Sequence, residues 1–392
     1  MKSILFVSVL IGVTSIVFAT RPTVTGLDKP APVPSHSNGD KKAAPPHIEV
    51  CFVLDTTGSM GGLIEGAKQK IWSISNEIVK AKPVPVLNIG LVAYRDRADE
   101  YITKSFPLTD DIDSVYAHLM ALRAEGGGDE PESVNAALAE AVRKMDWSTD
   151  SHVLKLIFLV GDAPPHMDYP DDVKYPEICQ EAVKKNIIIN SVQCGSLPET
   201  TPDWQKIARL GEGQYTSVGE TGDVAIVATP MDKKLADLTA AIGKTLVPYD
   251  KAEDQREVRD KQAVAEASFA APASAAAASD RLYYNVNTKK AVQGNHELVA
   301  DYATNSAVLE KVPQADLPAS LQNKKPEEIA AYLKQQQATR IDLQKQIGEI
   351  SRQREKYIAE QRANQAGHKD SFDDEVAKIL RAEAAKIGLN YE

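Results

Sequence analysis

The sequence of 392 residues is acidic, with a net charge of −10, and 43% of its residues are hydrophobic. A chain of this length can bury one large core and still supply further segments. Surfaces that bind nucleic acids are rich in Lys and Arg, because these side chains neutralise phosphates. The acidic balance therefore gives no support for a nucleic-acid partner.

Residues 1–19 have the pattern of a secretory signal peptide. Lys2 precedes an apolar stretch over 4–18, and Ala19 is a small residue of the kind found at a cleavage junction. A membrane anchor is the competing interpretation, but the stretch is short for a span, so we expect no transmembrane span in the mature chain. We expect export to a secreted or periplasmic location. Residues 20–46, which are rich in proline, serine and lysine, are expected to form a linker.

Residues 47–250 alternate between predicted strands and predicted helices. This alternation is typical of an α/β fold in which helices cover both faces of a doubly wound, mostly parallel sheet. Apolar runs without polar alternation fit strands that are buried on both faces. The predicted strands are 50–54, 87–94, 101–108, 154–160, 187–194 and 214–218, with 101–108 at an edge, and the predicted helices are 60–79, 112–123, 133–147, 176–185, 203–210 and 231–246. Because the pattern closes at Leu246, we expect residues 47–250 to fold alone.

Oxygen-bearing side chains follow two of the central strands. Asp55, Thr57 and Ser59 come directly after the first strand, and Asp162 follows a later one. Between them lies a glycine-rich loop loaded with carboxylates, residues 125–132. On its own, the first motif is explained as well by a helix N-cap at Ser59. Because ligands of open α/β sheets bind outside the carboxyl ends of the strands, the three loops together predict a cation site.

The set of Asp55, Thr57, Ser59, the glycine-rich loop and Asp162 resembles the metal-ion-dependent adhesion site of a von Willebrand factor type A domain. The resemblance covers about half of the chain. It implies a doubly wound domain that holds one divalent ion and leaves a coordination position for an acidic group of a protein partner. Carboxylate and hydroxyl oxygens are hard ligands, so we expect Mg²⁺ or Mn²⁺ as the cofactor.

The second loop departs from the family pattern, because the threonine that many members place there is absent. We expect Asp129 to be the metal ligand from this loop, with Glu132 behind it, and the sequence does not decide between the two. Nearby glycines at 126–128 allow the backbone to turn tightly. Three carboxylates around a dication weaken its attraction for another anion. Either one carboxylate binds through water, or the site prefers its own ligands to those of a partner.

Three further residues near the same edge are candidates for a metal or ligand rim. Arg95 and Asp96 follow the second strand, where a solvated turn explains them equally well. His166 lies shortly after Asp162, and a solvated loop histidine is the simpler interpretation of it.

Three cysteines occur in the chain. Cys51 starts a buried strand and is most simply a core residue. Cys179 and Cys194 both lie towards the ligand-binding edge, so a disulfide between them is an open alternative, because spacing alone does not give the required geometry.

Residues 251–280 are rich in alanine and charged residues and are expected to form a linker. Residues 281–392 are expected to be mainly helical, apart from a hairpin around 281–284 and 290–292. Residues 325–366 carry a heptad seam of apolar residues, interrupted by Gln336, Arg340 and Arg354. A helical hairpin and self-association through a coiled coil are both compatible with this pattern.

The last segment predicts an amphipathic helix. Ser371 and Asp374 resemble a capping box, and one apolar stripe follows before Gly388. We expect this helix to dock on the helix that precedes it, in preference to a separate partner.

These features together favour an exported, metal-dependent protein-binding module that uses its cation to engage an acidic group of a partner. The alternatives are a metal-stapled structural component of an envelope assembly and, third, a magnesium-dependent hydrolase. The sequence contains neither a phosphate-binding loop nor a Gly-x-Ser-x-Gly nucleophile motif. We therefore expect that the protein is not an enzyme.

Overall fold

The computed structural model describes residues 45–128, 130–219, 227–270, 272–363 and 372–391. The expected signal peptide, most of the expected linker over 20–46, and Ser371 lie outside these ranges. The described residues belong to one compact unit, Pro45–Glu392. Within the described ranges, no helix is both long and apolar enough to cross a membrane.

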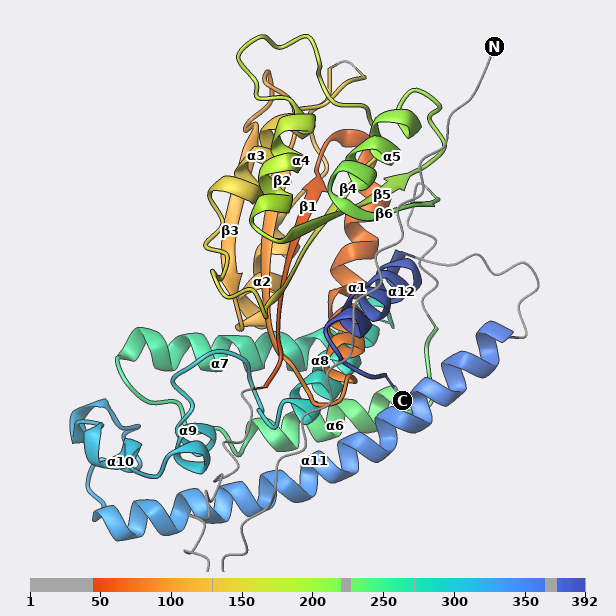
Figure 1. The fold of residues 1–392 in the computed structure, drawn as a ribbon. Coiled ribbons are helices and arrows are strands. Elements are labelled where there is room, and N and C mark those ends of the chain that lie inside the picture. The colour runs from red at the N-terminus through yellow and green to blue at the C-terminus, as the bar shows by residue number, and fades with distance from the viewer. Residues whose placement is uncertain (1–44, 129, 220–226, 271, 364–371, 392) are drawn as a thin grey trace, which may run out of the picture. The chain divides into compact units, whose positions relative to one another are not determined.

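A six-stranded sheet forms the centre of the fold, in the order β3-β2-β1-β4-β5-β6 (Figure 1). All neighbouring strands are parallel except β3, which pairs antiparallel with β2 at one edge. The predicted strands and the doubly wound α/β class are confirmed. The strands are β1 (His47–Asp55), β2 (Val86–Tyr94), β3 (Thr103–Thr109), β4 (Leu154–Gly161), β5 (Ile187–Cys194) and β6 (Glu212–Val218).

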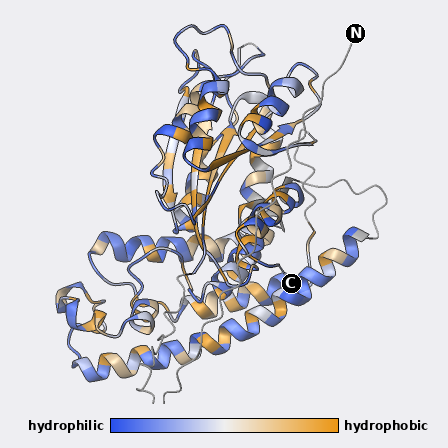
Figure 2. Cartoon of the chain, in the orientation of Figure 1, coloured by the Kyte–Doolittle hydropathy of each residue, from blue (hydrophilic) through white to orange (hydrophobic). Residues whose placement is uncertain are grey.

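Helices cover both faces of this sheet, because the side chains of β1 alternate between two hydrophobic clusters. Val50, Phe52 and Leu54 pack in the cluster that contains α1 and α2, whereas Cys51 and Val53 pack in the cluster that contains α3, α4 and α5. The hydrophobic colour is accordingly concentrated in the strands in Figure 2. These helices are α1 (Gly61–Val79), α2 (Ile112–Ala121), α3 (Val134–Arg143), α4 (Tyr175–Lys184) and α5 (Thr201–Leu210).

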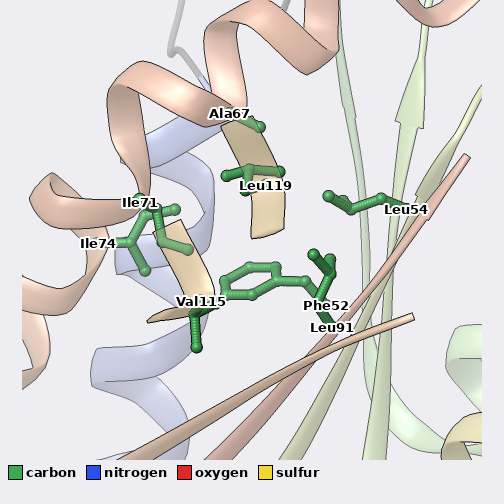
Figure 3. A pocket seen from close by; sticks show the side chains of 8 residues that line it. All are labelled: Phe52, Leu54, Ala67, Ile71, Ile74, Leu91, Val115 and Leu119. Atoms are coloured by element: carbon green, nitrogen blue, oxygen red, sulfur yellow. The ribbon is translucent and has the colours of Figure 1, made fainter. Parts of the chain in front are cut away.

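A small cavity of about 20 Å³ remains between α1, α2 and the sheet (Figure 3). Its lining is apolar and includes Phe52, Ala67 and Leu119. An apolar cavity of this size offers water no hydrogen-bond partners and stays dry. It is a packing defect of the core and is separate from the oxygen-rich loops.

The chain beyond residue 250 is helical where a linker and a hairpin were predicted. Residues 251–280 contain α7 and the first half of α8, and α8 also includes the first arm of the predicted hairpin. Alanine is the strongest helix former, so an alanine-rich segment with a surface to pack on becomes a helix. The helices of this part are α6 (Asp232–Gly243), α7 (Ala252–Ala267), α8 (Pro272–Asn287), α9 (Leu298–Thr304), α10 (Val308–Lys311), α11 (Pro326–Ala363) and α12 (Phe372–Lys386).

Two of these C-terminal helices complete the core of the sheet domain. Tyr284 of α8 and Leu380 of α12 belong to the same buried cluster as α1 and Phe52. In contrast, α6, the predicted closing helix of the sheet domain, packs in a different cluster with α8 and α11. Residues 47–250 thus lack part of their own core, which argues against independent folding.

The docking site predicted for the last helix is wrong. The apolar stripe of α12 packs on α1, and the chain after it forms backbone hydrogen bonds with Lys82 through Asn390. The helix thus docks inside its own chain, as predicted, but on an element far away in the sequence.

A buried ion pair fixes α8 to α2. The guanidinium of Arg281 donates to both oxygens of Asp113, over 2.6 and 2.8 Å, and the backbone N–H of Gln293 also donates to Asp113. Both charged side chains are buried. Loss of one member would leave an uncompensated charge, so this pair makes the position of α8 specific.

The apolar seam predicted for a coiled coil packs against other helices of the same chain. α11 is one continuous helix rather than a helical hairpin, and Leu333 and Ile347 on its seam are buried against neighbouring helices. Arg340, fully buried, pairs with Glu297 over 2.7 Å, and Arg354 pairs with Asp232 and Asp280. The arginines that interrupt the seam are therefore satisfied by carboxylates of the same chain.

The packing of α12 gives a direct test. Leu380 is 1% exposed, so Leu380→Ala should lower the free energy of unfolding by about 2–5 kcal/mol through lost burial and a residual cavity. Ile387, 40% exposed and just beyond the same helix, is the matched control, and Ile387→Ala should cost less than about 1 kcal/mol. Urea denaturation of the full chain measures both. Equal losses would show that α12 is not part of the core.

Candidate metal centre

The first oxygen-rich loop begins where β1 ends, at Asp55. The backbone N–H of Thr57 donates to Asp55 Oδ1 over 2.9 Å, and the Thr57 hydroxyl donates to the same oxygen over 2.6 Å. The Ser59 hydroxyl lies 3.3 Å from that of Thr57. Asp55 and Thr57 are buried, whereas Ser59 is exposed. The three predicted side chains therefore lie together, with Ser59 at the surface.

The other oxygen of Asp55 points into a buried space. Among the described residues, Asp55 Oδ2 has no hydrogen-bond partner, although it is inaccessible to solvent. A buried carboxylate oxygen without a protein partner is costly, and such an oxygen commonly faces a bound ion or water molecule.

The second loop contributes Glu132 to the same space. Asp129, the residue expected to be the ligand, lies outside the described residues, so its role stays a prediction. Glu132 is 3% exposed, and its Oε2 also has no hydrogen-bond partner within the described part of the chain. A side chain added at Gly127 would lie 3.5 Å from Glu132 Oε1 and 3.5 Å from the Thr57 side chain. Glu132 and Thr57 thus both lie beside Gly127.

Backbone hydrogen bonds join Glu132 to the third loop. Its N–H donates to the carbonyl of Pro164 over 2.9 Å, and its carbonyl accepts from the N–H of His166 over 3.0 Å. The second loop is also bonded to the first, because Gly58 donates to the Gly126 carbonyl over 3.2 Å. All three loops are therefore held in one cluster before any ligand is considered.

The third loop starts at Asp162, directly after β4. Its position is fixed by the preceding Gly161, where an added side chain would lie 2.5 Å from the Tyr94 hydroxyl and 3.0 Å from Asp55 Cβ. The Thr200 hydroxyl donates to the Asp162 carbonyl over 2.7 Å. This close approach of β4 and β1 brings the carboxylates of Asp162 and Asp55 to the same edge of the sheet.

A cleft of about 660 Å³ opens over these loops. Side chains of Thr57, Ser59, Glu132 and Asp162 line one side of it. The connection between β5 and α5, residues 195–198, lines the other. The cleft therefore opens beside the oxygen cluster, with Asp55 buried beneath its lining.

The carboxylates of the cluster are buried, carry like charges and lie close together, which raises the pKa values of Asp55 and Glu132. Burial raises the pKa of Asp55 to about 7, although the hydrogen bonds from Thr57 lower it, and the charges of Asp162 and Asp99 add to the rise. Burial, followed by the charge of Asp55, raises the pKa of Glu132 to about 9. No Lys or Arg of the described residues pairs with either carboxylate. A cation bound between Asp55 and Glu132 would favour the charged form of each carboxylate and so lower both pKa values.

The donor set fits a hard divalent cation. Buried, partnerless oxygens of Asp55 and Glu132 face the space between the loops, and the hydroxyls of Thr57 and Ser59 lie beside them. Magnesium and manganese take such oxygen ligands. The predicted ligands Asp55, Thr57, Ser59 and Asp162 are thus brought together, and Glu132 is the buried carboxylate that the described part of the second loop adds to them.

Arg95 is buried and braces the first loop from beneath, so the interpretation as a solvated turn is wrong. It is 3% exposed, its Nε donates to the Thr56 carbonyl over 3.2 Å, and another of its nitrogens donates to the Arg123 carbonyl over 2.9 Å. The guanidinium also lies over the ring of Tyr101. It thereby ties the chain on either side of the site together.

Asp96 and His166 belong to a separate buried network. Asp96 accepts hydrogen bonds from the hydroxyls of Ser133 and Tyr169, over 2.7 and 2.8 Å, and His166 Nε2 lies 3.5 Å from it. His166 is 4% exposed, so the interpretation as a solvated histidine is wrong. Each oxygen of Asp96 thus accepts one hydrogen bond, and the network positions the loop behind Glu132.

Asp99 holds the glycine-rich loop beside the site, and the sequence did not reveal this role. Both of its carboxylate oxygens lie 3.2 Å from the backbone N–H of Gly127, and Oδ2 also accepts from the N–H of Asp96. Gly126 and Gly127 have φ values of +85° and +82°, which glycine alone adopts at little cost. The glycine run was the only signal that a nearby side chain would hold this loop.

The three cysteines are free and buried. The open question of a disulfide between Cys179 and Cys194 is answered in the negative, and the expected core position of Cys51 is confirmed. Burial raises the pKa of each thiol well above its ordinary value.

Comparison with known proteins assigns the sheet domain. The family model for the von Willebrand factor A domain matches residues 49–228. Residues 49–228 form a von Willebrand factor A domain. The resemblance to this family is thus confirmed. The matched residues include the carboxyl end of each strand from β1 to β6.

Curated relatives match about a third of the chain. The von Willebrand factor A domain-containing protein 7 of Homo sapiens is 33% identical over 120 residues, and that of Mus musculus is 36% identical over 120 residues. Each alignment covers 31% of this chain and 12% of the relative. The chain therefore spans only a small part of the relatives it matches.

Two solved structures also match part of the chain. The SpRpn10 VWA domain is 15% identical, with a TM-score of 0.34, over 44% of this chain and 88% of that one. Proximal thread matrix protein 1 from the mussel byssus, in a form with a zinc-occupied MIDAS motif, is 16% identical, with a TM-score of 0.35, over 44% of this chain and 41% of that one.

The role of Glu132 can be tested against its exposed neighbour. Glu132→Gln removes a buried charge that faces the site, so it should weaken Mg²⁺ or Mn²⁺ binding by about tenfold or more. Glu130→Gln, which removes an exposed carboxylate at the cleft, should change the affinity by less than about threefold. Calorimetric titration measures both. Equal affinities for Glu132→Gln and the parent chain would assign the second-loop ligand to another residue.

The raised pKa values of Asp55 and Glu132 predict a pH dependence. The folded, metal-free protein holds protons on these groups that the unfolded chain releases, so its free energy of unfolding should fall as the pH rises from about 4 to about 9. A cation competes with those protons, so Mg²⁺ should raise the melting temperature more at pH 8 than at pH 5. In Glu132→Gln, the magnesium effect on the melting temperature should differ less between pH 5 and pH 8. A magnesium effect that is the same at both pH values would contradict this linkage.

Proposed function

We propose that the von Willebrand factor A domain of this protein is a metal-dependent protein-binding module. Asp55, Thr57, Ser59, Glu132 and Asp162 would hold one Mg²⁺ or Mn²⁺ ion at the floor of the cleft. The observation that carries this proposal is the pair of buried oxygens, Asp55 Oδ2 and Glu132 Oε2, that have no hydrogen-bond partner among the described residues. The class of the domain, which mediates protein interactions, is consistent with it.

The chemistry of binding follows from the arrangement of the loops. The ion would supply a positive charge at the end of the sheet. Buried carboxylates hold that charge from below, and the open cleft leaves the outer side to an acidic side chain of a partner. The braces from Arg95 and Asp99 keep the loops in place before the partner arrives, which limits the entropy lost on binding.

A second candidate is a purely structural ion. Asp55, Glu132 and Asp162 come from three different loops, so one ion bound to them would staple these loops together. Their combined negative charge exceeds that of a dication, which weakens the attraction for a further anion. The two candidates differ in whether metal is needed for contact with a partner.

Export belongs to this proposal, with residues 1–19 acting as the signal. The first residue of the chain recovered from its native source tests it, because cleavage at the expected junction would leave Thr20 first.

We further propose that the protein has no catalytic activity of its own. Hydrolytic turnover that requires added metal would contradict this part.

The experiment uses the full chain, immobilised, with the envelope fraction of its native source. A partner should be retained in Mg²⁺ and released by a chelator, and Asp55→Ala should abolish retention because it removes the ligand at the centre of the first loop. Asp237→Ala removes an exposed carboxylate of α6 and should retain the partner as the parent chain does. Metal binding by calorimetry without any metal-dependent retention would favour the stapling ion over the binding module.

A further inference from the structure

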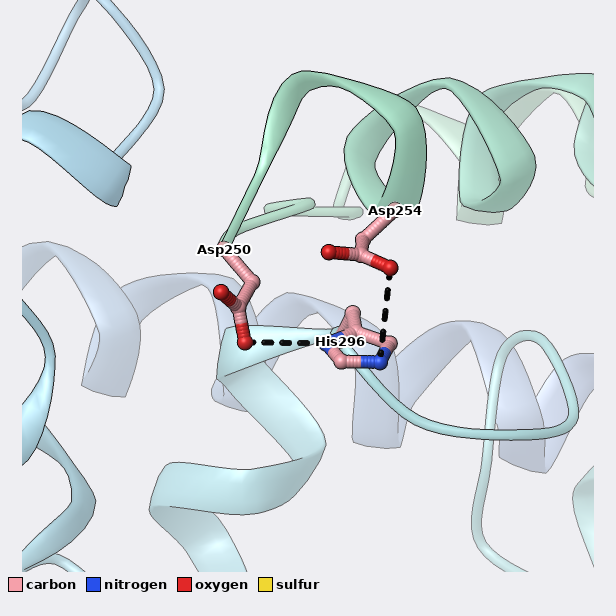
Figure 4. A group of neighbouring side chains, drawn as sticks. All are labelled: Asp250, Asp254 and His296. Carbon is pink, nitrogen blue, oxygen red and sulfur yellow. Dashed lines mark ion pairs between the residues drawn. The ribbon is translucent and has the colours of Figure 1, made fainter.

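A second group of potential metal ligands lies far along the chain from the first, at Asp250, Asp254 and His296 (Figure 4). Asp250 follows α6, Asp254 lies in the first turn of α7, and His296 precedes α9. His296 Nδ1 is 3.3 Å from Asp250 Oδ2, and its Nε2 is 3.8 Å from Asp254 Oδ1. One ligand atom from each of the three residues lies within 4.8 Å of the others.

Both carboxylates are oriented towards the imidazole by a group outside the cluster. The backbone N–H of Lys251 lies 3.1 Å from Asp250 Oδ1 and 3.2 Å from Asp254 Oδ2. Each aspartate therefore has one oxygen held by the backbone, while its other oxygen faces His296. In metal sites, hydrogen bonds of this kind fix the direction of the ligating oxygens.

The position of His296 is fixed by the backbone on the other side. Its carbonyl accepts from the N–H of Tyr249 over 3.1 Å, and Glu297 forms an isolated antiparallel bridge with Pro248. Glu297 is itself anchored by the buried Arg340. The segment that contains His296 is thus paired with the segment that leads into Asp250, so the imidazole and the carboxylates are brought together by the fold.

We propose that Asp250, Asp254 and His296 form a second divalent-metal site, of the kind that prefers Zn²⁺. Zinc with bonds of about 2.0 Å has neighbouring ligand atoms about 3.3 Å apart, close to the separation of His296 and Asp250. One ion takes a single imidazole nitrogen, so a turn of the ring must bring that nitrogen between the two carboxylates. The side chains are 24% to 40% exposed, which allows this movement and leaves a position for water.

The identity of the ligands separates this site from the one at the sheet edge. A histidine nitrogen favours zinc and similar transition metals over magnesium, which takes oxygen ligands. The two sites share no residue. An ion at the second site would join the start of α7 to the segment before α9, and so stabilise the helical part of the chain.

The test is calorimetric titration of the full-length Asp55→Ala variant, in which the first site is disabled, with zinc chloride. One equivalent of Zn²⁺ should bind, and Mg²⁺ at the same concentration should not. His296→Gln in this background should weaken zinc binding by about tenfold or more, because it removes the nitrogen ligand. His152→Gln is the matched control, since His152 contacts a single aspartate, Asp150, and is 93% exposed; it should leave the affinity unchanged.

Asp254→Asn provides a second variant that keeps the shape of the side chain, and circular dichroism shows whether each variant is folded. It should also weaken zinc binding, and zinc should raise the melting temperature of the Asp55→Ala chain but not of either double variant. If the Asp55→Ala chain does not bind zinc, the cluster is only an ion pair of His296 with its aspartates, and the proposal is overturned. Unchanged zinc affinity in folded His296→Gln and Asp254→Asn variants would overturn it as well.

Discussion

The constraint on which the site depends is the burial of like charges at the carboxyl edge of the sheet. Asp55, Glu132 and Asp162 come from three loops, and burial with mutual repulsion raises the pKa of the first two. A fold does not ordinarily retain such a cluster, because an unpaired buried charge costs several kcal/mol. The surrounding hydrogen bonds hold the carboxylates together in spite of this cost. A bound cation is the simplest physical reason for the arrangement.

The core explains how the loops are held. β1 is buried on both sides, and its register with β4 pairs Leu54 with Val160, so Asp55 and Asp162 leave the sheet side by side. The helix that follows the first loop, α1, packs in turn on α8 and α12. The support of the site therefore extends to the last helix of the chain, and the domain is coupled to its helical C-terminal region through α1.

Much of the sheet domain could be predicted from periodicity alone. Apolar runs such as 154–160 marked the central strands, and the acidic residue after such a strand marked the edge of the sheet. In the second loop, the glycines could be recognised from the sequence. The choice between Asp129 and Glu132 could not be made, because it depends on backbone angles and on backbone hydrogen bonds to the third loop. Asp99 was missed for the same reason, since its partner Gly127 is distant in the sequence.

The C-terminal region was predicted less well, because its partners are far away along the chain. The alanine-rich residues 251–280 have the composition of a linker or of a helix, and only the surface of α1 and its neighbours decides in favour of the helix. In the sequence, Arg340 and Arg354 interrupt the apolar seam of a predicted coiled coil. Their carboxylate partners, which include Glu297 and Asp232, turn these arginines into fixed contacts within the chain.

The most direct test of the central claim is a crystal structure of the protein grown with Mn²⁺ and measured for anomalous scattering. The account predicts one manganese peak in the cleft, with Asp55 Oδ2 and Glu132 Oε2 both turned towards it. A cleft without a manganese peak at saturating Mn²⁺, with both carboxylates hydrogen-bonded to water or protein, would contradict it.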